Sequence, residues 1–161
     1  MIDVSNLTKK YGNVTAINNI SFTAHPGQVT GFLGPNGAGK TTTMRILTGF
    51  MPPTSGSATV ADFDVFEQSM DVREQVGYLP ETVPLYRDMS ALGYLMYIGE
   101  MRGLSNRKQK AREVLERVGL EDRAKSKIDT LSKGMKQRLG LASAIIHNPA
   151  VLILDEPTIG L

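Results

Sequence analysis

The chain has 161 residues, a formal net charge of +2 and no cysteine. Its length suits one domain with a sizeable core, and the lack of cysteine excludes disulfides, thiolate catalysis and cysteine-ligated zinc. The mild charge does not indicate nucleic acid binding, which is typical of clustered Lys and Arg. No apolar run approaches the roughly 20 residues that span a bilayer, and the first residues do not read as a signal peptide. We expect a chain that is soluble or peripheral to a membrane.

Two segments at the N-terminus predict a pair of strands. Residues 2–7 alternate between apolar and polar side chains, and residues 16–22 could pair with them. Tyr11 and Gly12 lie in the turn between the two segments. An exposed ring at this place could stack on a nucleobase, or it could simply pack in the hairpin. The pattern leaves both interpretations open.

Residues 34–41 read Gly-Pro-Asn-Gly-Ala-Gly-Lys-Thr and match the phosphate-binding pattern G-x-x-x-x-G-K-[ST] at every fixed position. The glycines let successive backbone N–H groups point at phosphate oxygens, Lys40 adds a charge near the β- and γ-phosphates, and Thr41 would hold Mg²⁺. We predict a short strand over residues 29–33 and a helix over residues 42–47, which bring the phosphate to a helix N-terminus. A Gly-rich surface turn with a solvated lysine is the alternative, which this order of elements disfavours.

The middle of the chain predicts strands followed by helices. Residues 57–65 and 76–79 have strand character. Helices are predicted over about residues 90–101 and around residues 111–118, the second stopped by Gly119. The inward faces consist of Leu92, Leu95, Met96 and Gly99 in the first helix and Ala111, Val114, Leu115 and Val118 in the next. We expect these helices to belong to an insert, over about residues 82–146, that leans on the sheet.

A further helix is predicted from Leu131 to the His-Asn-Pro sequence at residues 147–149, where proline forbids continuation. Ser132 can serve as its N-cap, and the inward face consists of Leu131, Met135, Leu139 and Ala142. The Ser132 hydroxyl and the Gly134 N–H at this positive helix end could bind an anion. A plain capped helix explains the same residues equally well.

Residues 150–154 are uniformly apolar, as in a central parallel strand that is covered on both faces. Asp155 and Glu156 end this strand, and carboxylates at that end lie beside the crevice where ligands of open α/β sheets bind. We assign Asp155 to Mg²⁺ and Glu156 to orienting and deprotonating an attacking water. Solvated acids at a strand end are the alternative.

The order and spacing of these motifs resemble the ATP-binding cassette (ABC) ATPases that drive ABC transporters, over essentially the whole chain. Residues 34–41 match the family's Walker A motif, residues 151–156 its Walker B motif with the adjoining glutamate, and residues 131–138 its signature, while Tyr11 falls at the adenine-stacking position. The resemblance implies an α/β P-loop NTPase core with a mixed sheet, an N-terminal antiparallel β part and an α-helical insert. It implies one nucleotide-binding domain over residues 1–161, incomplete at the C-terminus.

The resemblance also implies ATP and Mg²⁺ as ligands and ATP hydrolysis as the activity, with Lys40 and Glu156 as catalytic residues. The implied nucleotide contacts are Tyr11, Gly34, Asn36, Gly37, Ala38, Gly39, Lys40, Thr41 and Thr42, together with Ser132 and Gly134, which would meet the γ-phosphate held by a second subunit. The implied metal-binding residues are Thr41, Glu81 and Asp155. The implied partners are a second ATP-binding subunit and a membrane permease, with no nucleic acid, at the cytoplasmic face of the cell membrane.

Within the insert, the segment 82–103 is rich in large apolar and aromatic side chains, which cannot all face one side of a helix. These residues are Tyr86, Met89, Tyr94, Met96, Tyr97 and Met101. In related transporters this region receives a cytoplasmic helix of the membrane subunit, so the resemblance implies that it docks the permease. Packing of the insert on the sheet is the alternative.

Three features depart from the family pattern. The signature reads Leu-Ser-Lys-Gly-Met at residues 131–135 instead of Leu-Ser-Gly-Gly-Gln, which is similar to bacterial exporters with separate ATPase subunits, including the multidrug group. Glu81 replaces the usual glutamine; a carboxylate can bind Mg²⁺ but cannot donate a hydrogen bond unless protonated. Residues 157–161 start the loop that crosses the family's dimer, and the following strands and switch histidine are absent.

Two functions from different classes remain open. The chain could be the ATPase of a membrane transporter, or a truncated nucleotide-binding fragment or regulatory module that holds ATP without turning it over. An ABC-type ATPase of ribosomes or chromosomes is disfavoured, because the sequence has neither a second cassette nor a long coiled coil between the motifs.

Overall fold

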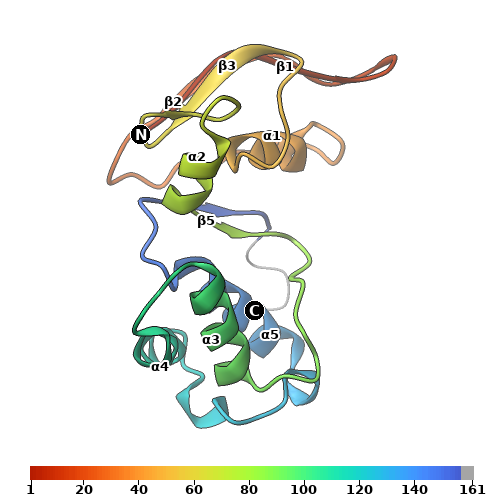
Figure 1. Cartoon of the computed structure of the whole chain (residues 1–161). Helices are drawn as coiled ribbons and strands as arrows, with labels where there is room; N and C mark the ends of the chain where they lie inside the picture. Colours follow the sequence, from red (N-terminus) through yellow and green to blue (C-terminus); the bar gives the residue numbers. More distant parts are fainter. Residues whose placement is uncertain (157–161) are drawn as a thin grey trace. The chain divides into compact units, whose positions relative to one another are not determined.

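The computed structural model describes residues 1–156, so the predicted start of the dimer-crossing loop at residues 157–161 lies outside the described residues. The chain forms two compact units, residues 1–76 and residues 77–161. Figure 1 shows that the strands of the long sheet belong to the first unit and that the larger helices belong to the second. Each unit has its own buried residues.

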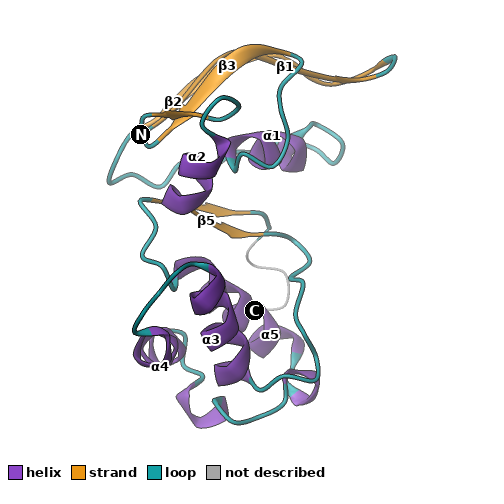
Figure 2. Ribbon diagram, viewed as in Figure 1, coloured by secondary structure: helices purple, strands orange, loops and turns teal. Residues whose placement is uncertain are grey.

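The first unit contains a four-stranded antiparallel sheet in the order β2-β1-β3-β4 (Figure 2). β1 (Ile2–Tyr11) and β2 (Val14–Ala24) form a hairpin, which confirms the predicted strand pair. β3 spans Ser55–Val60 and β4 spans Phe63–Asp64. The predicted single strand over residues 57–65 is therefore wrong, because the chain reverses between β3 and β4.

Two short helices complete the first unit. α1 spans Lys40–Leu47, as predicted to within two residues, and α2 spans Ser69–Gln75. No periodic pattern of apolar residues indicated α2, because Val72 is the only residue of this helix that is buried. The buried apolar residues of the unit are Val4, Leu7, Ile17, Ile46, Leu47, Ala58, Val60, Val65, Val72 and Val76.

The strand predicted over residues 29–33 does not form. Val29 and Leu33 have exposed fractions of 103% and 93%, and only Phe32 of this run packs inward, with its ring centroid 5.4 Å from that of Phe22. A strand is stabilised by pairing with a neighbour and by burial of its side chains, and no strand among residues 1–156 pairs with this segment. The phosphate loop is therefore preceded by irregular chain.

The second unit consists of a two-stranded sheet and three helices (Figure 2). β5 spans Val76–Leu79 and pairs with β6, which spans Val151–Leu154. The helices are α3 (Ala91–Met101), α4 (Arg107–Arg117) and α5 (Lys133–Ile145), with two 3₁₀ turns between α4 and α5 at Glu121–Arg123 and Ile128–Thr130. The predicted strand 76–79 and all three predicted helices are thus confirmed.

The core of the second unit confirms most of the predicted inward faces. Leu95 and Gly99 of α3 and Ala111, Val114 and Leu115 of α4 are buried. Leu92, Met96, Val118 and Met135 are partly buried against the same cluster, which also contains Leu131, Leu139 and Ala142. Gly119 ends α4 with φ of 64°, and the following N–H of Leu120 donates to the carbonyl of Leu115 at 2.8 Å.

The sheet of this unit is less covered than expected. Leu152 in β6 has an exposed fraction of 42%, so the prediction of a strand covered on both faces is wrong for the described residues. With β5 as its one neighbour there, β6 is not a central strand. One face is packed closely, however, because a Cβ atom at Gly77 of β5 would collide with the carbonyl oxygen of Ala144 in α5. Helix α5 therefore leans on the sheet, as predicted.

Four backbone hydrogen bonds join the segment around the start of α3 to the segment that precedes α5. The N–H groups of Ala91 and Leu92 donate to the carbonyls of Ser126 and Ala124, at 3.1 and 2.9 Å. In the other direction, Ile128 and Asp129 donate to the carbonyls of Met89 and Arg87, at 2.9 and 3.1 Å. We call this pairing of residues 87–92 with residues 124–129 the backbone ladder.

Among the described residues, no helix is both long and apolar enough to cross a bilayer.

Candidate nucleotide site

The phosphate loop connects irregular chain to α1, and its shape depends on two glycines. Gly37 and Gly39 have φ of 82° and 86°, a region that favours glycine. Gly39 is also pressed against β2, since a Cβ atom there would collide with the carbonyl oxygen of Ala16. The N–H of Ala38 donates to the carbonyl of Pro35 at 3.2 Å, which closes the turn. The loop is thereby held against the sheet of the first unit.

Helix α1 begins with backbone amides that no side chain caps. Gly39 is the N-cap residue and has no side chain to accept from the first turn. The first intrahelical bond comes from the N–H of Thr43, which donates to the carbonyl of Gly39 at 2.8 Å. The preceding N–H groups, those of Lys40, Thr41 and Thr42, therefore have no helical acceptor. Such amides, at the positive end of the helix dipole, suit the oxygens of a phosphate.

The side chain of Lys40 turns back over the phosphate loop. Its ammonium group donates to the carbonyls of Gly34 and Pro35, at 2.7 and 3.0 Å. Neither contact is to a carboxylate, and within the described part of the chain the positive charge is compensated by the dipoles of neutral carbonyls. A phosphate in the loop would meet this charge directly.

Tyr11 stands at the end of β1 with its ring 47% exposed. Its hydroxyl donates to the sulfur of Met51 at 3.2 Å, and the ammonium of Lys9 lies 5.4 Å from the ring centroid. Tyr11 pairs with Val14 of β2, two residues before Ala16, where the phosphate loop touches the same strand. Sequence reasoning missed Lys9, although residues two apart in a strand share a face and could have indicated the contact.

Asp155 follows β6 and is the most buried acidic residue of the described chain, with an exposed fraction of 2%. Its N–H donates to the carbonyl of Leu79 at 2.9 Å, so the carboxyl ends of β5 and β6 meet at one edge. The carboxylate oxygen Oδ2 is buried and has no hydrogen-bond partner among residues 1–156. An unpartnered buried carboxylate oxygen is costly and fits a divalent cation, which prefers such ligands.

The neighbouring acids are arranged differently. Glu156 adopts φ of 51°, so the chain turns sharply after Asp155, and its side chain is exposed. Glu81, two residues after the end of β5, is also exposed. Among residues 1–156 no three or more acidic or histidine side chains gather as a ready metal site. A metal held here would therefore need oxygen ligands from other groups in addition to the Asp155 carboxylate.

Ser132 caps α5, as predicted, because its hydroxyl oxygen accepts the N–H of Met135 at 3.2 Å. The hydroxyl hydrogen remains available to another acceptor. Ser132 is exposed and Gly134 is half-buried in the first turn of the helix. Arg138, one turn further on, donates to the carbonyls of Val118 and Gly119 at 2.9 and 3.0 Å and so ties α5 to the end of α4.

The candidate residues fall into two groups. The first unit holds Tyr11 and the loop residues Gly34, Asn36, Gly37, Ala38, Gly39, Lys40, Thr41 and Thr42. The second unit holds Glu81, Ser132, Gly134, Asp155 and Glu156. Within the second unit, the Leu79–Asp155 hydrogen bond brings the start of the Glu81 segment to the two acids that follow β6.

Comparison with known proteins agrees with these motifs. The profile of the ABC transporter family matches residues 17–159. The linearmycin resistance ATP-binding protein LnrL of Bacillus subtilis (strain 168) is 42% identical to this chain, over 100% of the chain and 52% of the relative. The bacitracin transport ATP-binding protein BcrA of Bacillus licheniformis is 39% identical, also over 100% of this chain and 52% of the relative. The chain thus spans about half the length of these curated relatives.

Solved structures give the same result. A dimeric structure of MJ0796, a bacterial ABC transporter cassette, matches with a TM-score of 0.90 and 27% identity, over 100% of this chain and 76% of the other. A post-hydrolysis dimer of the cassette MJ0796, bound to ADP and Pi, matches with a TM-score of 0.88 and 25% identity, over the same shares. The predicted α/β P-loop NTPase fold is therefore confirmed, and this chain belongs to the ATP-binding proteins of the ABC transporter family.

Proposed function

We propose that this chain binds Mg-ATP and, in a dimer with complete sites, hydrolyses it to drive transport by a membrane permease. The observation that carries the proposal is the phosphate loop, with its uncapped amides at the start of α1 and the Lys40 ammonium folded over it. We further propose that residues 1–161 belong to one nucleotide-binding domain, whose helical insert spans about residues 82–146. Its expected place is the cytoplasmic face of the membrane, as a peripheral subunit.

Binding of the nucleotide would use backbone amides and side chains of the first unit. The amides and Lys40 would take the phosphate oxygens, and the half-exposed ring of Tyr11 would stack on the base. Lys9, held near the Tyr11 ring and bonded through its ammonium to the carbonyl of Pro52 at 2.7 Å, would support the position of the ring.

Metal binding is supported by the buried, unpartnered Oδ2 of Asp155. When bound, Mg²⁺ would neutralise phosphate charge. Its proposed oxygen ligands are Asp155 and Glu81 of the second unit and Thr41 of the first. Glu156, exposed beside Asp155, is free to orient a water and accept its proton. Ser132, whose hydroxyl hydrogen is not used in capping α5, and Gly134 would donate to the γ-phosphate held by a second subunit.

Fewer residues are available to contact the permease than the sequence suggested. Tyr94 has an exposed fraction of 3%, and Met89 and Met96 are partly buried against the core, so these three belong to the packing of the unit. Tyr86, Tyr97 and Met101 remain exposed, at 55%, 38% and 69%. The Tyr86 and Tyr97 rings meet edge to face with centroids 5.7 Å apart. We propose that these three residues contact the permease.

Titration with a fluorescent ATP analogue tests the first step. Lys40→Ala should weaken binding strongly, because a charge-assisted contact to phosphate is lost. Lys10→Ala is the matched control, since Lys10 is an exposed lysine of the same unit. Unchanged affinity of the Lys40 variant, or an equal loss in the control, would refute the assignment of Lys40.

A second candidate function is a nucleotide-binding module without turnover. The observation that favours it is Glu156, whose exposed side chain has no hydrogen bond or ion pair among the described residues. Phosphoryl transfer depends on positioned groups, so we expect the 161-residue chain alone to hydrolyse ATP poorly or not at all. Phosphate release by this chain should be compared with a longer version. Steady turnover that Glu156→Gln abolishes would exclude the module.

A further inference from the structure

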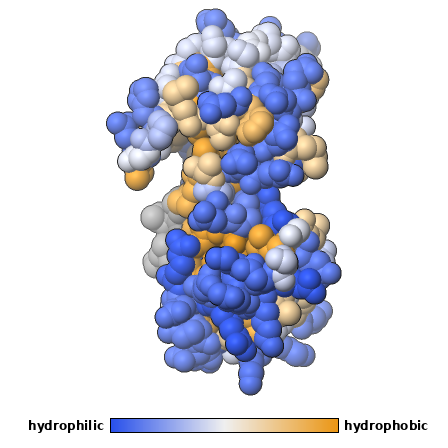
Figure 3. All heavy atoms as spheres, turned by 60° about the vertical axis from the view of Figure 1, so that its left-hand side comes forward, coloured by the Kyte–Doolittle hydropathy of each residue, from blue (hydrophilic) through white to orange (hydrophobic). Residues whose placement is uncertain are grey.

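Charge is distributed very unevenly along the chain. Residues 102–138 contain twelve Lys and Arg against five Asp and Glu, a net charge of +7, and the rest of the chain therefore carries −5. The net charge of +2, which by itself does not indicate nucleic acid binding, hides this difference. All of these cations belong to the second unit. Figure 3, which turns the α4 side of Figure 1 forward, shows hydrophilic residues over much of the lower half of that face.

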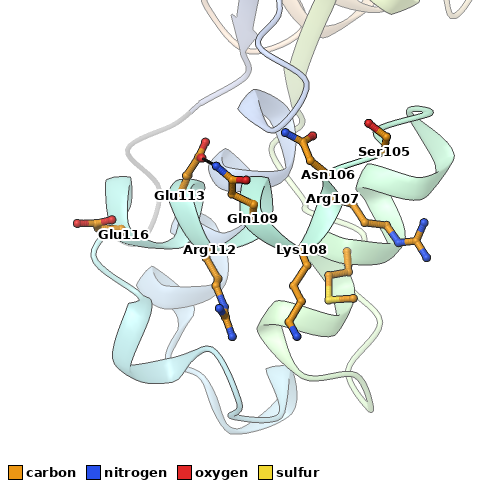
Figure 4. Close-up of a pocket in the computed structure, with 9 residues that line it drawn as sticks. Ser105, Asn106, Arg107, Lys108, Gln109, Arg112, Glu113 and Glu116 are labelled. Carbon is orange, nitrogen blue, oxygen red and sulfur yellow. Dashed lines mark hydrogen bonds between the residues drawn. The ribbon is translucent and has the colours of Figure 1, made fainter.

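Part of this charge lies at a shallow depression of about 860 Å³ where α4 lies beside α3 (Figure 4). The lining includes Met96 of α3 and, from α4, Arg107, Lys108, Arg112, Glu113 and Glu116. Gly99 of α3 lies directly against Arg107, which fixes the start of α4 against α3. Packing against α3 thus fixes the position of the α4 backbone that carries these cations.

The acids of the depression do not neutralise its cations. The Glu113 carboxylate accepts hydrogen bonds from Lys110 and from Gln109, both at 2.9 Å, and these contacts lower the pKa of Glu113. Arg107 lies 3.8 Å from Glu100, at the edge of an ion pair. Lys108 and Arg112 form no ion pair among the described residues. Figure 4 shows their side chains extending in the same direction, on the other side of the helix from Glu113.

Lys108 and Arg112 are one helical turn apart, at positions i and i+4, where like charges repel each other. Neither charge is compensated by an ion pair with an acidic side chain among the described residues. An external anion would relieve the repulsion. We refer to Lys108 and Arg112, with the surrounding depression, as the cationic face of α4.

The surroundings favour one class of anion. Residues 102–138 contain no Phe, Trp, Tyr or His, so the segment itself offers no ring to stack on bases. Further cations of the segment, Arg117, Arg123, Lys125 and Lys127, are exposed around the same unit. Long, solvated side chains spread over a surface match an array of mobile phosphate groups better than a fixed partner with directed contacts. We infer that the cationic face of α4 binds the phosphate groups of anionic phospholipids at a membrane surface.

Vesicle flotation with the full 161-residue chain tests this inference without ATP or a permease, so it can fail independently of the proposed function. The chain should float with vesicles of equal parts phosphatidylcholine and phosphatidylglycerol and not with phosphatidylcholine alone. Binding should fall as salt is raised. The double variant Lys108→Gln, Arg112→Gln should lower the partition coefficient roughly 30-fold, from roughly fivefold for each cation near an anionic surface.

The matched control is Lys10→Gln, Arg45→Gln, which removes the same charge from two exposed residues of the first unit. Equal loss in this control would overturn the inference, since net charge alone would then explain binding. Two other outcomes would also overturn it. In one, inorganic phosphate at matched ionic strength releases the chain, which indicates a site for free phosphate. In the other, a DNA duplex binds more tightly than the anionic vesicles under the same conditions.

Discussion

Residues 1–76 and residues 77–156 offer their proposed ligand contacts through different parts of the amino acid. In the first unit most contacts are backbone amides of the phosphate loop, and glycines at positive φ give that loop its shape. In the second unit they are mainly side chains: the Ser132 hydroxyl and the carboxylates of Asp155 and Glu156. The first unit should therefore be sensitive to an added methyl group, and the second to a change of charge or hydroxyl.

The largest effect of an added methyl group is expected at Gly39. Gly39→Ala combines an unfavourable φ of 86° with a collision between Cβ and the carbonyl of Ala16. We expect a loss of about 3 kcal/mol or more in the free energy of unfolding, with loss of nucleotide binding. Gly37→Ala is the control, with a similar φ of 82° but no atom within 4 Å, and should cost about 1 kcal/mol. Urea unfolding measures both, and equal costs would contradict the close contact with β2.

In the second unit, the largest effect is expected from a charge placed in the core. Tyr94→Asp puts a carboxylate where the side chain is 3% exposed, and should cost about 4 kcal/mol and unfold the helices. Tyr97→Asp, at a 38% exposed position three residues later, should cost less than about 1 kcal/mol. Thermal unfolding followed by circular dichroism separates them. If Tyr94→Asp stayed folded, the proposed division between packing and permease residues would be wrong.

A smaller effect separates capping from phosphate binding at Ser132. Ser132→Ala removes the acceptor for the N–H of Met135 and should cost about 1 kcal/mol. Ser132→Asp restores the cap and the stability, but its negative charge would repel a γ-phosphate. Thermal unfolding and ATP-dependent dimerisation in sedimentation are the two measurements. Dimerisation that survives in Ser132→Asp would leave this residue with a capping role only.

The smallest effect concerns Glu113. The hydrogen bonds from Lys110 and then Gln109 lower the pKa of its carboxyl. A lowered pKa in the folded state gives stability that is present above the unfolded value of about 4.3 and is lost as the pH falls through the folded pKa. Glu113→Gln should therefore weaken the fold slightly near neutral pH and have no effect near about pH 2. A difference between variant and parent that is independent of pH would contradict this interpretation.

Signals that are local in sequence predicted the structure well. The loop pattern, the Ser132 cap and the helices from residue 91 onward depend on spacing over a few residues. The strand at residues 29–33 failed because a strand needs a partner, which no local pattern reports. The turn at Ala61 and Asp62, with φ of 50° and 71°, had no glycine to mark it.

Prediction of the site was limited in the same way, because local patterns do not report burial or contacts with distant residues. The loop pattern pointed to Lys40, but only the structure could show that Oδ2 of Asp155 is buried without a partner or that Tyr94 is packed inside. The charge of residues 102–138 was different, because it could have been read from the sequence by counting segment by segment. A total for the whole chain conceals such a cluster.

The backbone ladder of the second unit has a mechanical consequence. It pairs residues 87–92, directly after Tyr86, with residues 124–129, directly before the turn that leads to Ser132. Four main-chain hydrogen bonds resist relative sliding of the two segments far better than a flexible loop would. The two segments should therefore move together as one rigid element. A displacement of Tyr86 would then be transmitted to Ser132 as a movement of the whole N-terminal end of α5. It would not be absorbed by bending of the chain between the two residues.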